Sequence, residues 1–194
     1  MLDDKFKVVF LVGFILGSAI RARYTRPCRR NRISAKRGTV LDALLVALAS
    51  VGLAILPLVY LLTSWLDFAD YHLPAWVGWI GAGVFAVALW LLWRSHVDLG
   101  LNWSAKLEIR EGHSLVTRGV YGRIRHPMYA AHWLWALAQA FLLHNWIAGP
   151  ALLVLFLPLY FLRVPHEEQL MIDQFGEEYR QYMNGTGRIN PRWR

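Results

Sequence analysis

Residues 75–93 read AWVGWIGAGVFAVALWLLW, an apolar run without a single charge. A helix needs about 20 apolar residues to cross a hydrocarbon core of about 30 Å. Residues 40–66 form a second run of sufficient length, in which Asp42 is the one charged residue. These two runs predict membrane-spanning helices.

Three shorter apolar runs lie on either side, at residues 6–20, 129–143 and 147–162. The first contains Gly13 and Gly17, a spacing of small residues that lets membrane helices approach closely. The last two are separated by only three residues, and fifteen helical residues reach only about 22 Å. They therefore predict a helical hairpin that either enters the membrane from one side or barely spans it. We predict an all-α fold, a polytopic membrane bundle of five transmembrane helices at 6–20, 40–66, 75–93, 129–143 and 147–162, forming a single domain over residues 1–194.

The composition supports a membrane protein. Of the 194 residues 56% are hydrophobic and only 18% are charged, whereas soluble domains carry about 25% charged residues. The single cysteine, Cys28, excludes a disulfide framework and a zinc site built on paired thiolates. We predict no metal site. The net charge of +8 is concentrated at the ends of apolar runs, which favours contact with the lipid bilayer and argues against a nucleic-acid partner.

The charges of the loops predict the orientation. Residues 21–37 contain eight basic residues and no acid, whereas residues 63–74 contain two acids and no Lys or Arg. By the positive-inside rule the basic loop is cytoplasmic and the N-terminus is outside. The opening residues lack the basic region and cleavage site of a signal peptide, so we expect the first run to be retained. The result is an integral, multi-pass membrane protein, with residues 94–128 and 163–194 both in the cytoplasm.

Those two polar segments carry the candidate site. His126 and Pro127 lead into the fourth helix, where proline suits the first position and the free amides suit an anion. Leu115 and Val116 lie between glycines and suggest a short extended piece. After the fifth helix, Pro165 begins another helix that carries Glu167 and Glu168. Because the two ends of a hairpin lie close together, we expect these acids near His126 and Tyr129.

Three motifs in this region resemble a known family. They are GHSLVTRGVY at 112–121, RHPMY at 125–129, and an arginine four residues before Glu167-Glu168. Together they resemble the isoprenylcysteine carboxyl methyltransferases and the related phospholipid methyltransferases. The similarity extends from Leu99 to Tyr182, and the short chain resembles the five-helix prokaryotic branch. This resemblance implies a prokaryotic plasma membrane as the location.

The resemblance implies S-adenosyl-L-methionine as methyl donor and S-adenosyl-L-homocysteine as product. It also implies that Arg163 contacts the acceptor, and we assign Arg125 a similar role because an arginine holds a carboxylate by two hydrogen bonds. The implied donor-binding residues are His113, Leu115, Val116, Gly119, Tyr121, His126, Pro127, Tyr129 and Glu167. A carboxylate and aromatic faces suit the cationic sulfonium of the donor.

The implied reaction is O-methylation of the carboxylate of a prenylcysteine-like or isoprenoid acceptor, a lipophilic small molecule or lipidated chain that enters from the membrane. Methylation of a carboxylate requires alignment and a dry site but no general base. Three alternatives remain: a phospholipid or amine N-methyltransferase, an NADPH-dependent sterol or enone reductase, and a lipid-binding membrane scaffold without enzymatic activity. The sequence makes no prediction of oligomeric state.

Overall fold

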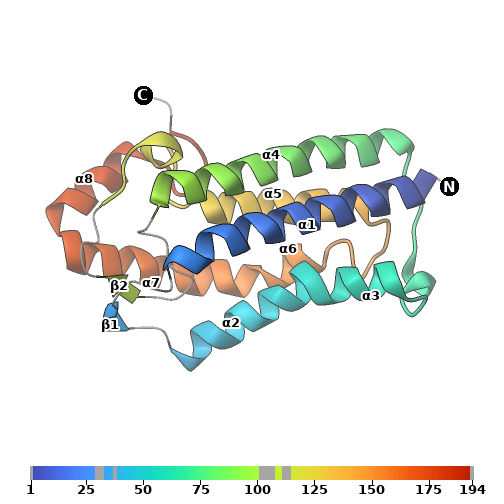
Figure 1. The fold of residues 1–194 in the computed structure, drawn as a ribbon, viewed down its shortest axis with the longest axis horizontal. Coiled ribbons are helices and arrows are strands. Elements are labelled where there is room, and N and C mark those ends of the chain that lie inside the picture. Colours follow the sequence, from blue (N-terminus) through green and yellow to red (C-terminus); the bar gives the residue numbers. More distant parts are fainter. Residues whose placement is uncertain (1, 29–32, 37–38, 101–107, 111–114, 193–194) are drawn as a thin grey trace.

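The protein is a bundle of helices that run back and forth along one long axis (Figure 1). The computed structural model describes residues 2–28, 33–36, 39–100, 108–110 and 115–192. The long helical segments are α1 (Leu2–Cys28), α2 (Val40–Ser50) with η1 (Val51–Ile55) and α3 (Leu56–Leu62), α4 (Ala75–Leu99), α5 (Pro127–Leu142), and α6 (Ala151–Leu155) with α7 (Leu157–Phe175). The short elements are η2 (Asp67–Ala69), η4 (Gly119–Gly122) and α8 (Glu177–Gly185). We call the end that carries α8 the α8 end and the opposite end the hairpin end.

The helical fold class is as predicted, but the structure adds a small sheet. Strand β1 (Ile33–Lys36) pairs antiparallel with β2 (Glu108–Arg110). We predicted no strand in either place, and the extended piece expected at Leu115–Val116 has no regular secondary structure. The ladder joins the α1–α2 connection to the segment after α4, and it satisfies backbone groups that lie outside the helices. Such long-range pairing leaves little local signal in a sequence.

Several helix boundaries differ from the prediction. α1 continues to Cys28 and α4 to Leu99, well into the polar residues after each apolar run. The run predicted at 147–162 breaks at Phe156, and α7 then continues through Pro165 to Phe175. Pro165 therefore lies inside a helix and does not begin one. A proline there removes one helical hydrogen bond and leaves one carbonyl without its helical donor, and the surrounding turns hold the helix together.

The α2–η1–α3 helix is continuous because its ends and its bend are stabilised locally. Thr39 and Asp42 form a reciprocal capping box at its start. The wider π turn η1 lies just before Pro57, which cannot donate a backbone hydrogen bond. The buried amide of Gln139 on α5 donates to the carbonyl of Gly52 in η1 at 3.0 Å and to that of Ala148 at 2.7 Å. One polar side chain thus links three parts of the bundle.

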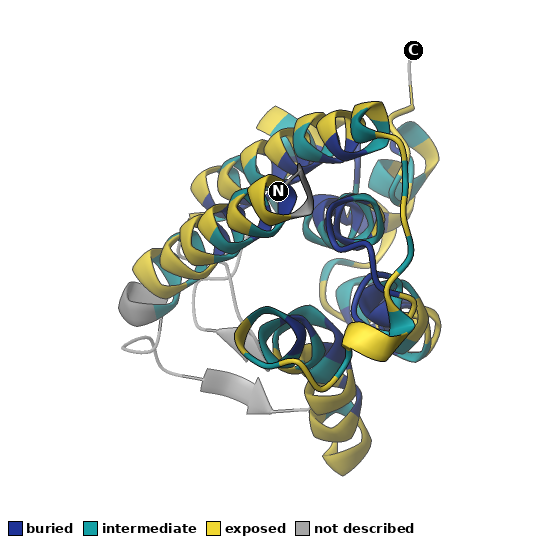
Figure 2. Ribbon diagram, turned by 90° about the vertical axis from the view of Figure 1, so that its right-hand side faces the viewer, coloured by how far each residue is buried: buried dark blue, intermediate teal, exposed yellow. Residues whose placement is uncertain are grey.

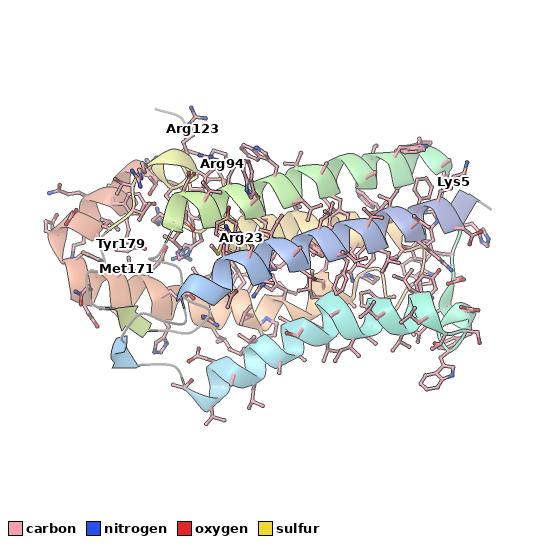
Figure 3. The ribbon with its side chains drawn as sticks, in the orientation of Figure 1. Lys5, Arg23, Arg94, Arg123, Met171 and Tyr179 are labelled. Atoms are coloured by element: carbon pink, nitrogen blue, oxygen red, sulfur yellow. The ribbon has the colours of Figure 1, made fainter. Side chains whose placement is uncertain are left out.

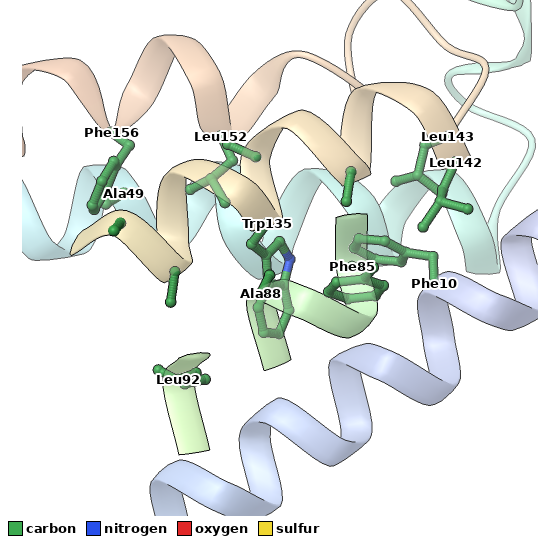
Figure 4. Close-up of a cluster of buried hydrophobic side chains, with 14 of the residues drawn as sticks. Phe10, Ala49, Phe85, Ala88, Leu92, Trp135, Leu142, Leu143, Leu152 and Phe156 are labelled. Atoms are coloured by element: carbon green, nitrogen blue, oxygen red, sulfur yellow. The ribbon is translucent and has the colours of Figure 1, made fainter. Parts of the chain in front are cut away.

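The core is an aromatic and aliphatic cluster to which all of the long helical segments contribute (Figure 4). The rings of Phe85 and Trp135 meet edge to face with centroids 4.8 Å apart. A side chain at Gly13 would overlap the Phe85 ring, and one at Gly17 would overlap the Trp135 ring. The two glycines therefore make room for neighbouring rings, which is why α1 can pack closely against α4 and α5.

The α5–α6 connection reaches the far end of the bundle. The backbone N–H of Trp146 donates to the carbonyl of Ala69 at 2.9 Å, and the buried Asn145 amide donates to Leu66 at 2.6 Å and to Asp70 at 2.8 Å. Residues 63–74 connect α3 to α4 at this end. The hairpin therefore runs the whole length of the bundle.

Large apolar side chains cover the outside of the helices. Two helices, Val40–Leu62 and Ala75–Leu99, are long and apolar enough to cross a membrane. Exposed positions follow the outward faces (Figure 2). Trp65, Phe68, Trp76 and Trp146 are 63–80% exposed near the hairpin end, and aromatic residues of this kind are typical of the membrane–water interface.

Candidate active site

The two polar segments that the sequence singled out meet at the α8 end. Residues 187–188, after α8, pair through their backbone with the residues just before α5. The Arg125 N–H donates to the carbonyl of Gly187 at 2.8 Å, and the His126 N–H donates to the carbonyl of Arg188 at 2.9 Å. Tyr179 and Met171 lie at this end, whereas Lys5 lies at the other (Figure 3). The start of α5 and the middle of α7 are therefore neighbours.

Glu168 is enclosed by three basic side chains. Its Oε1 lies 3.2 Å from Arg125 Nε, 3.2 Å from His126 Nε2 and 3.2 Å from Arg188 Nε, and its Oε2 accepts from Arg188 Nη2. The carboxylate is 5% exposed. Burial alone would raise the pKa of Glu168, but the hydrogen bonds from His126 and Arg188 outweigh burial and lower that pKa to about 2.

Glu167, the adjacent residue, has different surroundings. Its Oε1 accepts from the Tyr129 hydroxyl at 2.9 Å and from Arg163 Nε at 2.8 Å. Its Oε2 lies 3.8 Å from His126 Nδ1, beyond hydrogen-bonding distance. The side chain is 24% exposed. Within the described residues, Glu167 thus keeps one oxygen without a hydrogen bond.

The Tyr129 ring, whose hydroxyl binds Glu167, belongs to a cluster of aromatic rings. The Tyr129 ring packs edge to face on His126 at 5.7 Å, and it lies 5.9 Å from Phe156 and 6.1 Å from Tyr160. A carboxylate beside several aromatic faces is a favourable environment for a cation.

The turn before α5 brings Tyr121 to the same place. Asp98 fixes this turn, because its Oδ2 accepts from the Val120 N–H at 2.9 Å while Arg94 binds its Oδ1 at 2.6 Å. Gly119 has φ +62, and a side chain there would overlap the Asp98 carboxylate. Burial, together with the charges of Tyr182, Asp98 and Glu167, raises the pKa of the Tyr121 hydroxyl, which therefore stays protonated.

The matched region decides the family. Residues 79–173, which include α5, α7 and the turn between α4 and α5, match the sequence profile of the isoprenylcysteine carboxyl methyltransferase family. These residues belong to that family. Their match includes Tyr121, His126, Tyr129, Arg163 and Glu167.

Curated relatives agree with this assignment. The chain is 29% identical over 109 residues to protein-S-isoprenylcysteine O-methyltransferase B of Arabidopsis thaliana, covering 55% of each chain. It is 34% identical over 77 residues to form A of the same plant (40% of this chain, 39% of the relative) and 29% identical over 130 residues to the Homo sapiens enzyme (62% and 46%). The chain spans about half the length of these relatives or less.

The fold is shared with a solved member. The structure of the eukaryotic intramembrane Ras methyltransferase, an isoprenylcysteine carboxyl methyltransferase, superimposes with a TM-score of 0.50 at 22% identity. The match covers 78% of this chain and 51% of the other. At this identity the comparison shows a common fold.

The predicted site residues fall into three groups. Tyr121, His126, Tyr129, Arg163 and Glu167 come together as described above, and Pro127 occupies the buried first turn of α5. Leu115 and Val116 lie on the segment before η4, and Gly119 is the first residue of η4. His113 lies outside the described residues. Two open hollows adjoin this segment: one of about 510 Å³ includes Thr117, Tyr182 and Arg192, and one of about 390 Å³ includes Gly119, Arg94 and Trp90.

Arg125 has contacts that we did not foresee. Besides Glu168, its guanidinium donates to the carbonyl of Met183 at 2.9 Å and to that of Thr186. These contacts hold the end of α8 against the start of α5. Arg188, which completes the Glu168 cluster, stands in a C-terminal stretch without a recognisable motif, so no sequence signal pointed to it.

Proposed function

We propose that this chain is an S-adenosyl-L-methionine-dependent methyltransferase that converts the carboxylate of a lipophilic acceptor into a methyl ester. The observation that carries the proposal is the half-open carboxylate of Glu167, held between Tyr129 and Arg163 inside the family's matched segment. The curated relatives are named for methylation of isoprenylcysteine, which makes a prenylcysteine-like acid the first acceptor to test.

The residues at this place fit a cationic donor. Glu167 offers an oxygen with no hydrogen bond from a described residue, and Tyr129 and Tyr121 add phenol groups. We assign Glu167, His126, Pro127, Tyr129 and Tyr121 to the sulfonium and amino-acid part of the donor. When bound, S-adenosyl-L-methionine supplies a methyl group activated by its positively charged sulfur.

The nucleoside part of the donor is assigned to the segment before η4. Leu115, Val116 and Gly119 lie directly before Tyr121 in the chain, and His113 precedes them. The hollow that includes Thr117 and Tyr182 adjoins this segment. The positive φ of Gly119 and the Asp98 contact hold this backbone in place, so it is preformed for a ligand.

Arg163 is assigned to the acceptor. It is fixed by Glu167 at 2.8 Å, and an arginine can orient a carboxylate through parallel hydrogen bonds. Methylation of a carboxylate releases no proton, so the site needs no general base. We assign Arg125 a positioning role, because its donors already bind Glu168 and two α8 carbonyls.

Five membrane crossings complete the proposal. α1, α2–η1–α3, α4, α5 and α6–α7 would each cross once, with the N-terminus outside and the α8 end in the cytoplasm. The basic residues 21–37 and the acids of residues 63–74 support this orientation. Phe161 and Leu162 are 63% and 53% exposed directly before Arg163, which favours an acceptor that arrives sideways from the lipid.

Calorimetric titration of the purified chain with S-adenosyl-L-homocysteine tests the donor site. We expect saturable binding that NADPH does not compete with. The second arm follows transfer of tritiated methyl groups into an S-farnesyl-cysteine acid and, as control, into its amide. Absence of S-adenosyl-L-homocysteine binding at high micromolar ligand, or NADPH competition, would contradict the proposal. Label in a lipid amine instead of the acid would reassign the acceptor.

A further inference from the structure

Arg21 on α1 contacts a side chain of α5 at the α8 end of the bundle. Arg21 on α1 places its Nη1 3.0 Å from Nε2 of His132 on α5. The other ring nitrogen of His132 lies 2.7 Å from the carbonyl oxygen of Met128, which can only accept a hydrogen bond. Nδ1 therefore carries the proton, and Nε2 offers its lone pair to Arg21. His132 is a neutral partner.

Arg21 and Arg163 differ in their ion pairs with the described residues. No carboxylate of a described residue forms an ion pair with Arg21, whereas the charge of Arg163 is matched by Glu167 at 2.8 Å. Burial, and next the positive charge of Arg163, lower the pKa of the Arg21 guanidinium. Arg21 is only partly exposed, and His132 stacks on the ring of Phe156 at 5.6 Å. A half-buried cation without an anion is costly, so this place favours an anionic ligand.

We propose that Arg21 binds the carboxylate of the lipophilic acceptor, together with Arg163. This inference rests on the proposed function, and it identifies the residue that makes the site prefer an acceptor with a carboxylate over one with an amine. Helices α1, α5 and α7 contribute Arg21, His132 and Arg163, so the anion would be held between three passes. A protonated amine would meet the uncompensated charge of Arg21 and be rejected. In the sequence Arg21 looks like any other residue of the basic loop, and only the structure separates it from its exposed neighbour Arg23.

The experiment compares an acid with its amide. The full chain in lipid nanodiscs binds a fluorescent S-farnesyl-thiopropionic acid in the absence of donor, and unlabelled acid or primary amide displaces it. We expect the wild type to prefer the acid at least about tenfold, the size of one charged hydrogen bond. Arg21→Gln should lose most of that preference while its affinity for the amide stays within about twofold. Arg23→Gln, the matched control on the same helix, should keep the preference.

Two outcomes would overturn the inference: an unchanged acid preference in Arg21→Gln, or an equal loss of acid and amide binding, which indicates a merely structural role. Should Arg21→Gln not survive purification, Arg21→Lys decides, because it retains the charge and loses the planar fork. Its acid preference should then fall only in part, and an unchanged preference would contradict the inference.

Titration with S-adenosyl-L-homocysteine keeps the two proposals apart. Donor binding combined with an acid preference that ignores Arg21 would leave the methyltransferase and remove the anion site. An acid preference that depends on Arg21 in a chain that binds no S-adenosyl-L-homocysteine would remove the methyltransferase and leave the anion site.

Discussion

Glu167 and Glu168 are adjacent on α7, yet they occupy opposite kinds of environment. Glu168 is 5% exposed and receives hydrogen bonds from three basic side chains, whereas Glu167 is 24% exposed and keeps one oxygen without such a bond from a described residue. A carboxylate whose hydrogen bonds are all made within the protein stabilises the fold. One with an open oxygen can bind a ligand. We therefore expect Glu168 to stabilise the fold and Glu167 to bind the ligand, although the two residues are adjacent on one helix.

Replacement of Glu168 by alanine should have the largest effect on stability. The change leaves Arg125, His126 and Arg188 without their common acceptor, and removal of one member of a buried ion pair costs about 3–5 kcal/mol. We expect a large fall in the thermal unfolding temperature of Glu168→Ala in detergent. Glu168→Gln, which keeps the shape and one acceptor, should fall less. Wild-type stability in Glu168→Ala would show that the cluster does not hold α8 in place.

Replacement of Glu167 by glutamine should act on binding instead. We expect the affinity for S-adenosyl-L-homocysteine to fall about 10- to 100-fold, because a hydrogen bond to a charged group contributes about 1.5–3 kcal/mol. The unfolding temperature should change little. Calorimetric titration with S-adenosyl-L-homocysteine measures the affinity of Glu167→Gln and of Glu168→Gln under the same conditions. Equal losses of affinity in the two variants would contradict the division of roles between the two glutamates.

Much of this division could be predicted from sequence, but not all. The proximity of His126 and Tyr129 to Glu167 could be predicted from the helical hairpin. Two antiparallel helices joined by a short connection bring the start of the first helix close to the end of the second. The partners of Glu168 could not be predicted in the same way. Arg188 reaches it through a backbone pairing of residues 124–126 with 187–188, and such pairing depends on how the ends of the chain meet in space.

The same limit applies to the helices. The apolar runs predicted where the long helices lie, because a run of apolar residues marks a segment that is stable as a helix in an apolar environment. The apolar runs did not predict that α7 would continue through Pro165. The residues beyond Pro165 are largely polar, and their helical conformation depends on packing against neighbouring segments. The inward turn of Arg21 is a similar case, since its contact with His132 joins positions far apart in the sequence.

Asn145 tests whether lost stability by itself weakens binding. It lies at the hairpin end, fully buried, where its Oδ1 accepts from Ile147 N–H at 3.0 Å and Ala148 N–H at 2.9 Å. Loss of this side chain leaves several buried polar groups without a hydrogen bond, and each such group lowers the free energy of unfolding by about 1–3 kcal/mol. Asn145→Ala should therefore lower the unfolding temperature and leave S-adenosyl-L-homocysteine affinity unchanged. A parallel loss of affinity would mean that the two ends of the bundle are coupled.

Mild acid should produce the smallest change in stability, and this change comes from protonation of Glu168. Glu168 lies beyond the membrane-spanning part of α7, and its pKa is lowered from 4.5 to about 2. The unfolded chain therefore binds a proton at higher pH than the folded chain does, so the stability from Glu168 is complete well above pH 4.5 and is lost as the pH falls toward 2. At pH 4.5 the loss is only about 0.4 kcal/mol, since half of the unfolded chains are protonated there. Chemical unfolding of wild type and Glu168→Gln between neutral pH and pH 3 measures it. The gap in free energy of unfolding should narrow as the pH falls, and a gap independent of pH would mean that His126 and Arg188 do not hold Glu168 ionised.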